Sequence, residues 1–338
     1  MPAAASLGAK IPVLILFGPT ASGKTALLEE LFIRNPSCKG EIISADSMQV
    51  YRGMDIGTAK PTKEERARIP HHLIDILDPS EQFNTGEFVR LASEAISSAA
   101  NRSALPIVSG GTGFYIRNLI MGLPASPPAD LEIRALLKEE LKQHGASVLM
   151  EELAKCDPVS AEKIHLNDEY RLLRALEVFR ISGRPLSYFA QNEGKSEDQS
   201  SFRFLILGIK WDREVLYKRI NERCKSMFQS GLPDEVRKLY EAGYTPLDPG
   251  LRAIGYREFF IENENDLYTL SRDMTGVEAL VAQNCRRYAK RQLVFFASIP
   301  NVTWIEGDNV VKAAAEIRLK IKSYCNKPQI LRIITDFH

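Results

Sequence analysis

Short, largely apolar runs alternate with longer segments of mixed polarity through the first third of the chain. Three of these runs, Ile11–Phe17, Glu41–Ala45 and Pro106–Ser109, have the length of buried strands. The segments between them are long enough to hold helices. Strands separated in this way predict an α/β fold, with a parallel sheet, right-handed crossovers and helices on both faces.

The polarity pattern changes after the third run. Residues 123–128 predict a loop, and the stretch from there to about residue 189 has helical periodicity with few strand signals. The polar residues 191–201 predict a flexible connection, and strand character returns at Phe202–Ile209. We therefore expect an α/β core at residues 1–125 and 202–320, a mostly helical insertion domain at residues 126–201, and a C-terminal tail at residues 321–338.

Composition adds little beyond a globular class. The 338 residues are 44% hydrophobic and 26% charged, and the formal net charge is +1, so a nucleic-acid partner would have to meet a local basic surface. The five cysteines form no C-x-x-C pair, so neither a zinc site nor a disulfide framework is indicated. No apolar run spans a bilayer and the N-terminus lacks a signal pattern, so we expect a cytoplasmic protein without membrane contact.

The first strand leads directly into a phosphate-binding motif. Residues 18–25 read GPTASGKT and fit G-x-x-x-x-G-K-S/T, the P-loop pattern, in full. Its glycines let backbone N–H groups surround an anion, and the helix that follows adds its positive end. Lys24 supplies a point charge, and the Thr25 hydroxyl is placed to ligate Mg²⁺. The motif predicts a P-loop core that binds phosphate, without saying which phosphate.

The second strand ends at Asp46, at the sheet edge where the P-loop also lies. Such a carboxylate can be a metal ligand, a general base, or only the cap of a following turn. The segment Asp55–Pro61 reads as a loop that can close over a substrate, although its composition indicates no more than a loop. His71 and His72 precede a carboxylate, but their spacing fits no standard zinc site and favours loop packing.

A basic helix is expected late in the chain. Residues 284–292 place Arg287, Lys290 and Arg291 on one face, with Tyr288 on the opposite, apolar side. Two interpretations stay open for this face. It is either a solvated charged surface or a surface that contacts RNA phosphates, since no acidic residue is interleaved to neutralise it. In the insertion, by contrast, Glu177 lies among the arginines and favours a salt-bridged surface.

Together these segments resemble the bacterial-type tRNA dimethylallyltransferase family. The resemblance covers about residues 11 to 305 in the expected order. The matching blocks are residues 18–25 (GPTASGKT), 43–61 (ISADSMQVYRGMDIGTAKP), 71–75 with 78–79, 108–115 (VSGGTGFY), 157–164 (DPVSAEKI), 167–179, 253–258 (AIGYRE) and 288–292 (YAKRQ).

The resemblance implies a reaction and a set of roles. A dimethylallyl group would pass from its diphosphate to N6 of adenosine 37, next to the anticodon of tRNAs that read U-initial codons. The P-loop would hold the prenyl diphosphate rather than ATP, with Mg²⁺ near Thr25. Asp46 would be the general base, and Thr20 and Arg223 would complete the catalytic set. The diphosphate-binding residues would be Gly18, Thr20, Ala21, Ser22, Gly23, Lys24 and Thr25.

The resemblance also implies which residues meet tRNA. We expect the protein to bind the anticodon stem-loop as a monomer. Tyr170 stands where the family often has Gln. The expected tRNA-binding residues are Asp46, Ser47, Met48, Gln49, Thr112, Arg134, Tyr170, Arg171, Leu172, Leu173 and Arg174, joined by Arg287, Lys290 and Arg291 of the basic helix.

Three other functions remain to be distinguished. An enzyme that prenylates free adenine nucleotides would share the P-loop and Asp46 but would not need the insertion blocks or the YAKRQ helix. A small-molecule kinase would bind ATP at the P-loop. A non-enzymatic RNA-binding regulator would use the P-loop only as a structural anion site, and the joint presence of Lys24, Thr25 and Asp46 argues against it.

Overall fold

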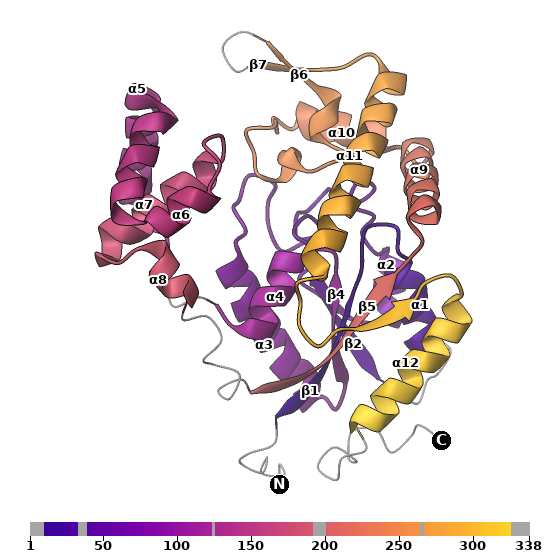
Figure 1. Cartoon of the computed structure of the whole chain (residues 1–338). Coiled ribbons are helices and arrows are strands. Elements are labelled where there is room, and N and C mark those ends of the chain that lie inside the picture. The colour runs from indigo at the N-terminus through magenta and orange to yellow at the C-terminus, as the bar shows by residue number, and fades with distance from the viewer. Residues whose placement is uncertain (1–9, 33–38, 124–125, 192–200, 264–266, 326–338) are drawn as a thin grey trace. The chain divides into compact units, whose positions relative to one another are not determined.

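The computed structural model describes residues 10–32, 39–123, 126–191, 201–263 and 267–325 (Figure 1). The chain divides into two compact units. One consists of Met1–Ile120 with Ser201–His338, and the other of Met121–Ser200. These bounds lie within five residues of the division that we expected at residues 126 and 201.

The first unit, here called the core unit, contains a six-stranded sheet in the order β3-β2-β4-β1-β5-β8, and every neighbouring pair is parallel. A separate antiparallel pair is formed by β6 and β7. The strands are β1 (Ile11–Phe17), β2 (Gly40–Ala45), β3 (His71–His72), β4 (Leu105–Gly110), β5 (Phe202–Lys210), β6 (Phe260–Asn263), β7 (Leu267–Leu270) and β8 (Thr303–Glu306). The predicted parallel α/β fold is confirmed.

Helices cover both faces of this sheet. Alternate side chains of β1 point to opposite faces, as the period of a strand requires. Leu14 and Leu16 pack in one cluster with α1 and α12, while Phe17 meets Phe296 of α11 on the other face, at 4.5 Å between ring centroids. The helices of the core unit are α1 (Lys24–Phe32), α2 (Lys63–Arg68), α3 (Thr85–Asn101), α4 (Gly113–Met121), α9 (Arg213–Gln229), α10 (Leu232–Glu241), α11 (Met274–Phe296) and α12 (Val310–Cys325), with short 3-10 turns η2 (Gly250–Arg252) and η3 (Arg257–Phe259).

The second unit, here called the insertion unit, consists of helices and connecting segments, with no strand among its described residues. Its helices are α5 (Leu131–Cys156), α6 (Pro158–Lys163), α7 (Glu169–Ser182) and α8 (Leu186–Gln191). Helix α5 is interrupted at Gly145, whose φ of 80° is accessible to glycine at little cost. Leucines of α5 and α7 form a small core of their own, which includes Leu137, Leu149 and Leu153. The helical insertion predicted from the periodicity is therefore present.

Two local predictions are corrected. His71 and His72 form the short edge strand β3 rather than a loop, because their backbones pair with Ile42 and Ile43 of β2. His72 Nε2 lies 2.7 Å from the Glu41 carboxylate, so this pair is structural, and no cluster of metal-binding side chains occurs among the described residues. The tail expected from residue 321 begins inside α12, which continues to Cys325.

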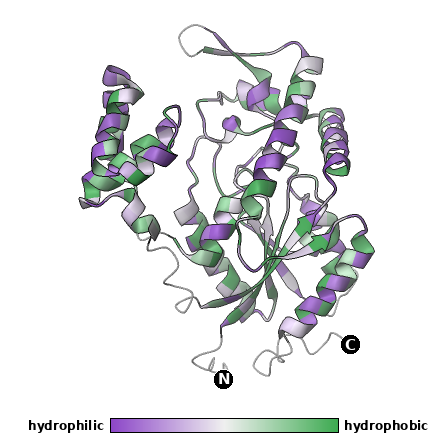
Figure 2. Ribbon diagram, in the orientation of Figure 1, coloured by the Kyte–Doolittle hydropathy of each residue, from purple (hydrophilic) through white to green (hydrophobic). Residues whose placement is uncertain are grey.

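Hydropathy follows this architecture. In Figure 2 the strands at the centre of the core unit are largely hydrophobic, whereas the helices around them alternate between hydrophobic and hydrophilic faces. No described helix combines the length and the apolar character that crossing a bilayer would require.

Candidate active site

A cavity of about 700 Å³ lies within the core unit, at the carboxyl ends of β1 and β2. The P-loop, the residues after β2, the turn near Gly57 and the helices α9 and α11 form its wall. The expected site residues that line it are Thr20, Ala21, Ser22, Gly23, Lys24, Thr25, Asp46, Ser47, Met48, Gln49 and Arg223. The fold thus brings together the P-loop, the carboxylate and the arginine, although they are far apart in the sequence.

The P-loop is held from outside by side chains of the C-terminal half. Ala21 has a φ of 62°, a left-handed conformation that costs free energy in a residue with a Cβ. Its carbonyl accepts a hydrogen bond from Arg219 Nε at 2.9 Å, and the Ser22 carbonyl accepts one from Trp211 Nε1 at 3.0 Å. The Arg219 guanidinium also stacks 4.3 Å from the Trp211 ring. These contacts hold the loop in its observed conformation.

Lys24 folds back onto the loop that carries it. Its Nζ donates hydrogen bonds to the carbonyls of Gly18 and Pro19 at 2.9 and 3.0 Å. Burial lowers the Lys24 pKa to about 8 and the nearby Arg223 acts in the same direction, while Asp46 opposes both. An ammonium with a lowered pKa gains from any anion that enters the cavity, since the anion favours its charged form.

Asp46 has a capping role and still presents its carboxylate to the cavity. Its Oδ1 accepts backbone N–H bonds from Met48 at 2.9 Å and Gln49 at 3.4 Å, so one of the alternatives left open by the sequence, the turn cap, is observed. Both bonds use the same oxygen. The second oxygen is engaged by no hydrogen bond to a described residue, which leaves it available to a ligand in the cavity.

Arg223 reaches the cavity from α9 without a carboxylate partner. It forms no ion pair with any residue that the structure describes, and burial lowers its pKa against the opposing effects of Cys285 and Asp46. A buried guanidinium keeps its charge and is costly to leave uncompensated. Together with Lys24 and Arg219 it makes this part of the cavity wall cationic, which suits a diphosphate.

Three further site residues were missed or misplaced by the sequence interpretation. Gln292 accepts a hydrogen bond from the Thr20 N–H at 3.0 Å and donates one to the Gly111 carbonyl at 2.7 Å, so it joins the P-loop to the end of β4. Tyr288, expected on the apolar side of the basic helix, lines the cavity, where burial raises the pKa of its hydroxyl to about 12. Arg219, which no sequence pattern singled out, supports the P-loop from α9. No local pattern marks these roles, because each depends on how α9 and α11 pack.

Thr112 connects two of the expected blocks. Its hydroxyl accepts a hydrogen bond from the Ser47 N–H at 3.0 Å, and its own N–H donates to the Ala45 carbonyl at 3.0 Å. Gln49 makes a similar link, accepting from the Ser44 hydroxyl at 2.9 Å. These residues shape the wall on the Asp46 side, and their contact with tRNA stays a prediction.

The loop expected at Asp55–Pro61 is a fixed wall in this structure. Glu235 of α10 accepts hydrogen bonds from three successive backbone N–H groups, at residues 55 to 57, over 2.8–3.1 Å. Glu235 also accepts a hydrogen bond from the Tyr256 hydroxyl at 2.7 Å. Lys60 is buried and pairs with Asp55 and Asp75, each at 2.6 Å. Since both ends of the loop are tied to the core unit, it frames the cavity.

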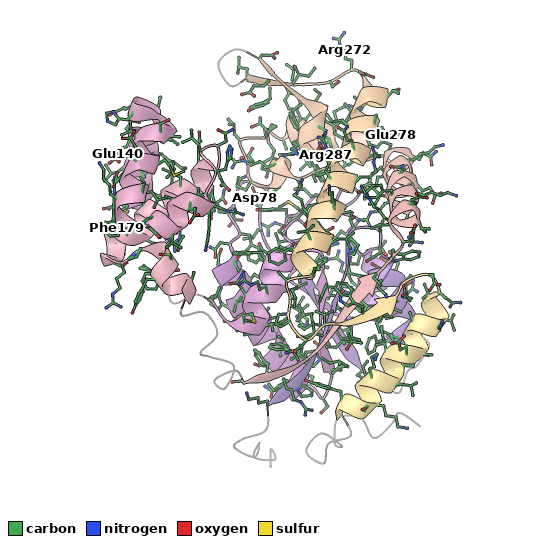
Figure 3. All side chains as sticks on the ribbon, in the orientation of Figure 1. Asp78, Glu140, Phe179, Arg272, Glu278 and Arg287 are labelled. Carbon is green, nitrogen blue, oxygen red and sulfur yellow. The ribbon has the colours of Figure 1, made fainter. Side chains whose placement is uncertain are left out.

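The basic face of α11 is exposed as predicted. Arg287, Lys290 and Arg291 are all solvent-exposed, and none forms an ion pair with a described carboxylate. Figure 3 shows Arg287 on α11, well away from the sheet. None of the three lines the cavity, so any contribution that they make is to binding rather than to the reaction itself.

In the insertion unit, several of the expected tRNA-binding residues have structural roles. Leu172 and Leu173 are 0% and 8% exposed and belong to the core of the unit, so their side chains serve packing. Arg134 and Arg174 each lie 2.7 Å from Glu177, whose side chain is completely buried. The salt-bridged surface favoured by Glu177 is thereby confirmed. Tyr170 is 71% exposed, and Arg171 is exposed while it pairs with Asp168 at 3.3 Å.

Hard oxygen donors are the groups from which a magnesium site could be built here. Thr25 is exposed at the start of α1 and Asp46 faces the same cavity, while no group of three His, Cys, Asp or Glu side chains is found among the described residues. Mg²⁺ commonly binds through one or two protein oxygens, substrate phosphates and water. The donor set therefore fits Mg²⁺ that arrives with a diphosphate.

Comparison with known proteins gives a consistent result. A family model described as IPP transferase matches residues 49–298. A tRNA dimethylallyltransferase of Geobacter sulfurreducens is 46% identical over 299 residues, which cover 88% of this chain and 93% of that protein. The solved structure of a tRNA isopentenylpyrophosphate transferase from Bacillus halodurans is similar with a TM-score of 0.64 and 36% identity, covering 96% of this chain and 99% of the other. A eukaryotic dimethylallyltransferase acting on tRNA reaches a TM-score of 0.76 at 27% identity, over 94% and 80% of the two chains.

Proposed function

Because the chain belongs to the IPP transferase family, we propose that it transfers a dimethylallyl group from dimethylallyl diphosphate to N6 of adenosine 37 in tRNAs that read U-initial codons. The observation that carries this proposal is the cavity, where an available carboxylate oxygen of Asp46 faces the same space as the cations of the P-loop and α9. One side of the cavity can accept a proton, and the other can hold a diphosphate.

Asp46 acts on the nucleophile. The exocyclic amine of adenine is a weak nucleophile because its lone pair is delocalised into the ring. A carboxylate that accepts the amine proton while the C–N bond forms contributes about 10²–10⁴ in rate. The hydrogen bonds from Met48 and Gln49 to Oδ1 fix the orientation of this carboxylate, and its second oxygen takes the proton.

The P-loop and α9 act on the leaving group. The allylic carbon tolerates positive charge as its bond to the diphosphate breaks, and the diphosphate gains negative charge. Lys24, Arg223 and the N–H groups of the P-loop stabilise that charge. Mg²⁺, held by Thr25 and the diphosphate oxygens, would supply further charge neutralisation when bound.

The α11 face and the insertion unit supply tRNA affinity. Arg287, Lys290 and Arg291 contact phosphates, and Tyr170 and Arg171 contact the same RNA from the insertion unit. The target base leaves the anticodon-loop stack to enter the cavity, which costs less in a loop than in a duplex. We propose that the protein acts as a cytoplasmic monomer.

One experiment tests the reaction. The full chain is incubated with dimethylallyl diphosphate, Mg²⁺ and unmodified tRNA, and the nucleosides are then separated after digestion. Isopentenyladenosine at position 37 supports the proposal. Prenylation of free adenine nucleotides in place of tRNA would show the related nucleotide enzyme instead.

Calorimetry separates the kinase alternative. We expect dimethylallyl diphosphate to bind the free protein with Mg²⁺, and ATP to bind weakly, since no adenine-specific feature accompanies the P-loop at residues 18–25. Tight Mg·ATP binding with weak dimethylallyl diphosphate binding would overturn the assignment.

A further inference from the structure

An exposed aromatic residue lies at the start of α4. Phe114 is 52% exposed, which is unusual for a phenylalanine in a folded core unit. It follows Thr112 and Gly111 by only two and three residues, and Gly111 lines the cavity while Thr112 hydrogen-bonds to Ser47 beside Asp46. Phe114 is therefore separated by only two or three residues from the part of the cavity wall that lies beside Asp46.

Gly113 determines where this ring lies. A Cβ at Gly113 would come 2.5 Å from the Phe295 ring, so only glycine allows the first turn of α4 to approach α11 so closely. The approach sets the rings of Phe114 and Phe295 edge to face, 6.5 Å apart with an interplanar angle of 67°. Phe295 supports Phe114 from one side and leaves the rest of its ring to solvent.

The surroundings of Phe114 combine apolar and cationic groups. Along α11 the exposed positions Arg287, Lys290, Arg291 and Val294 follow the i, i+3, i+4, i+7 spacing of one helix face, and Val294 is 70% exposed. Phe295 lies at the edge of this face. Figure 2 shows the same change along α11, from hydrophilic residues in its middle to hydrophobic ones at the end near α4.

The opposite flank of α11 faces the cavity, through Tyr288 and Gln292. Phe114 and Phe295 thus lie between a cationic face, which suits the RNA backbone, and the cavity that would receive a base. Exposed aromatic rings beside such cations are how single-stranded nucleic acid is bound, since each ring stacks on an unpaired base. A base pulled from its stack also leaves its former neighbour without a stacking partner.

We propose that Phe114 stacks on the unpaired tRNA base that neighbours the base entering the cavity, replacing the stacking contact that the neighbour loses. This inference rests on the proposed function. The exposed ring of Phe114 and the half-buried ring of Phe295 adjoin three exposed cations that pair with no described acidic residue. Because a polyanion complements such cations, the partner that binds here is RNA rather than another protein.

The test measures tRNA affinity of the full chain over a range of salt concentrations. We expect Phe114→Ala to weaken binding by about 5- to 150-fold, the range for removing one aromatic–base stack. The slope of log K against log salt should not change, because no counterion release is lost. Phe114→Trp should bind like the wild type, whereas Phe114→Leu should lose most of the affinity.

Matched controls make the outcomes distinct. Leu319→Ala removes another exposed apolar side chain, 70% exposed on α12, and should leave affinity unchanged. Unchanged affinity of Phe114→Ala, or full affinity of Phe114→Leu, would overturn the stacking role. If Phe114→Ala and the wild type differed in oligomeric state without RNA, the stacking role would also be overturned, because Phe114 would then join two copies of the chain. If the wild type neither binds nor modifies tRNA, the proposed function itself fails.

Discussion

Arginines of the insertion unit and arginines of the cavity stand in opposite electrostatic settings. In the insertion unit Arg134 and Arg174 converge on the buried Glu177, and Arg180 bridges two glutamates, one of which, Glu140, is labelled in Figure 3. In the core unit Arg223 lines the cavity without an ion pair to any described residue.

The difference separates stabilising charge from binding charge. Hydrogen bonds from Arg174 and Arg134 hold the Glu177 pKa below its usual value, although burial alone would raise it. Each charged group of this cluster has a partner of opposite charge, and the cluster links α5 to α7. The cavity has the reverse arrangement, with Lys24, Arg219 and Arg223 against Asp46 and the exposed Glu222. An excess of partly buried positive charge is typical of a site that binds an anion.

The strongest test of this contrast removes the cavity's inward carboxylate. Asp46→Ala should lower the single-turnover prenyl-transfer rate by about 10²–10⁴, because the amine proton loses its acceptor. tRNA affinity and the melting temperature should change little, since Asp46 is only partly buried and caps a single turn. Asp46→Asn is the matched control, as it can keep the cap while lacking the base. Retention of more than about a tenth of the rate would rule Asp46 out as general base.

Removing the corresponding acid of the insertion unit should act on stability instead. Glu177→Ala should destabilise that unit by about 3 kcal/mol, the lower end for breaking a buried ion pair, because both arginines retain some contact with water. Hydrogen exchange of α5 and α7 in the full chain measures this. Because the Glu177 pKa is lowered in the folded state, ionised Glu177 stabilises the insertion unit above the pKa of the unfolded carboxyl group, and this stabilisation is lost as pH falls. Glu177→Gln should therefore remove this acid dependence of stability. Equal exchange in the variant and the wild type would contradict the role.

A cavity arginine should affect ligand affinity. Arg223→Gln should weaken dimethylallyl diphosphate binding by about 10- to 150-fold, corresponding to one charge-assisted contact of about 1.5–3 kcal/mol. Arg180→Gln is the matched control in the insertion unit and should leave this affinity unchanged. Calorimetry without tRNA measures the affinity of both variants for dimethylallyl diphosphate. If the two variants bound it equally well, the cavity arginine would have no special role in ligand binding.

The basic face of α11 should affect tRNA affinity alone. Replacing Arg287, Lys290 and Arg291 with Gln should reduce the salt slope of tRNA binding by about two to three, at about 0.7–0.9 per phosphate contact, and spare the saturated rate. Lys312→Gln with Lys322→Gln on α12 is the control for loss of exposed charge. An unchanged slope would leave the α11 face as a solvated surface.

The smallest expected effect is a pH dependence. The Lys24 pKa is lowered to about 8, so the ammonium is charged below that pH and becomes neutral above it. A phosphate group with a pKa near 6 no longer changes its charge there, as a rough guide. Dimethylallyl diphosphate affinity should therefore fall as pH rises above about 8, and Lys24→Arg should remove this decline because arginine stays charged. A wild-type affinity that is flat from pH 7 to 10 would contradict it.

Much of the site could be predicted because its signals are local. The P-loop spacing, the strand before it and the placement of Asp46 at a second strand end are all readable within a few dozen residues. The basic face of α11 follows from helical spacing alone, and its exposure is confirmed. The insertion was visible as a change of periodicity.

What the sequence by itself determined is therefore the order of the elements, the parallel sheet and a P-loop motif on the same sheet edge as a carboxylate. Tertiary structure decided which charged groups are matched and which are left over. Leu172 became core and Arg174 a partner of Glu177, whereas Gln292 and Arg219 became supports of the P-loop from more than 190 residues away. The physical reason is that spacing fixes the face of an element on which a side chain lies, while burial and ion pairing depend on what packs against that face.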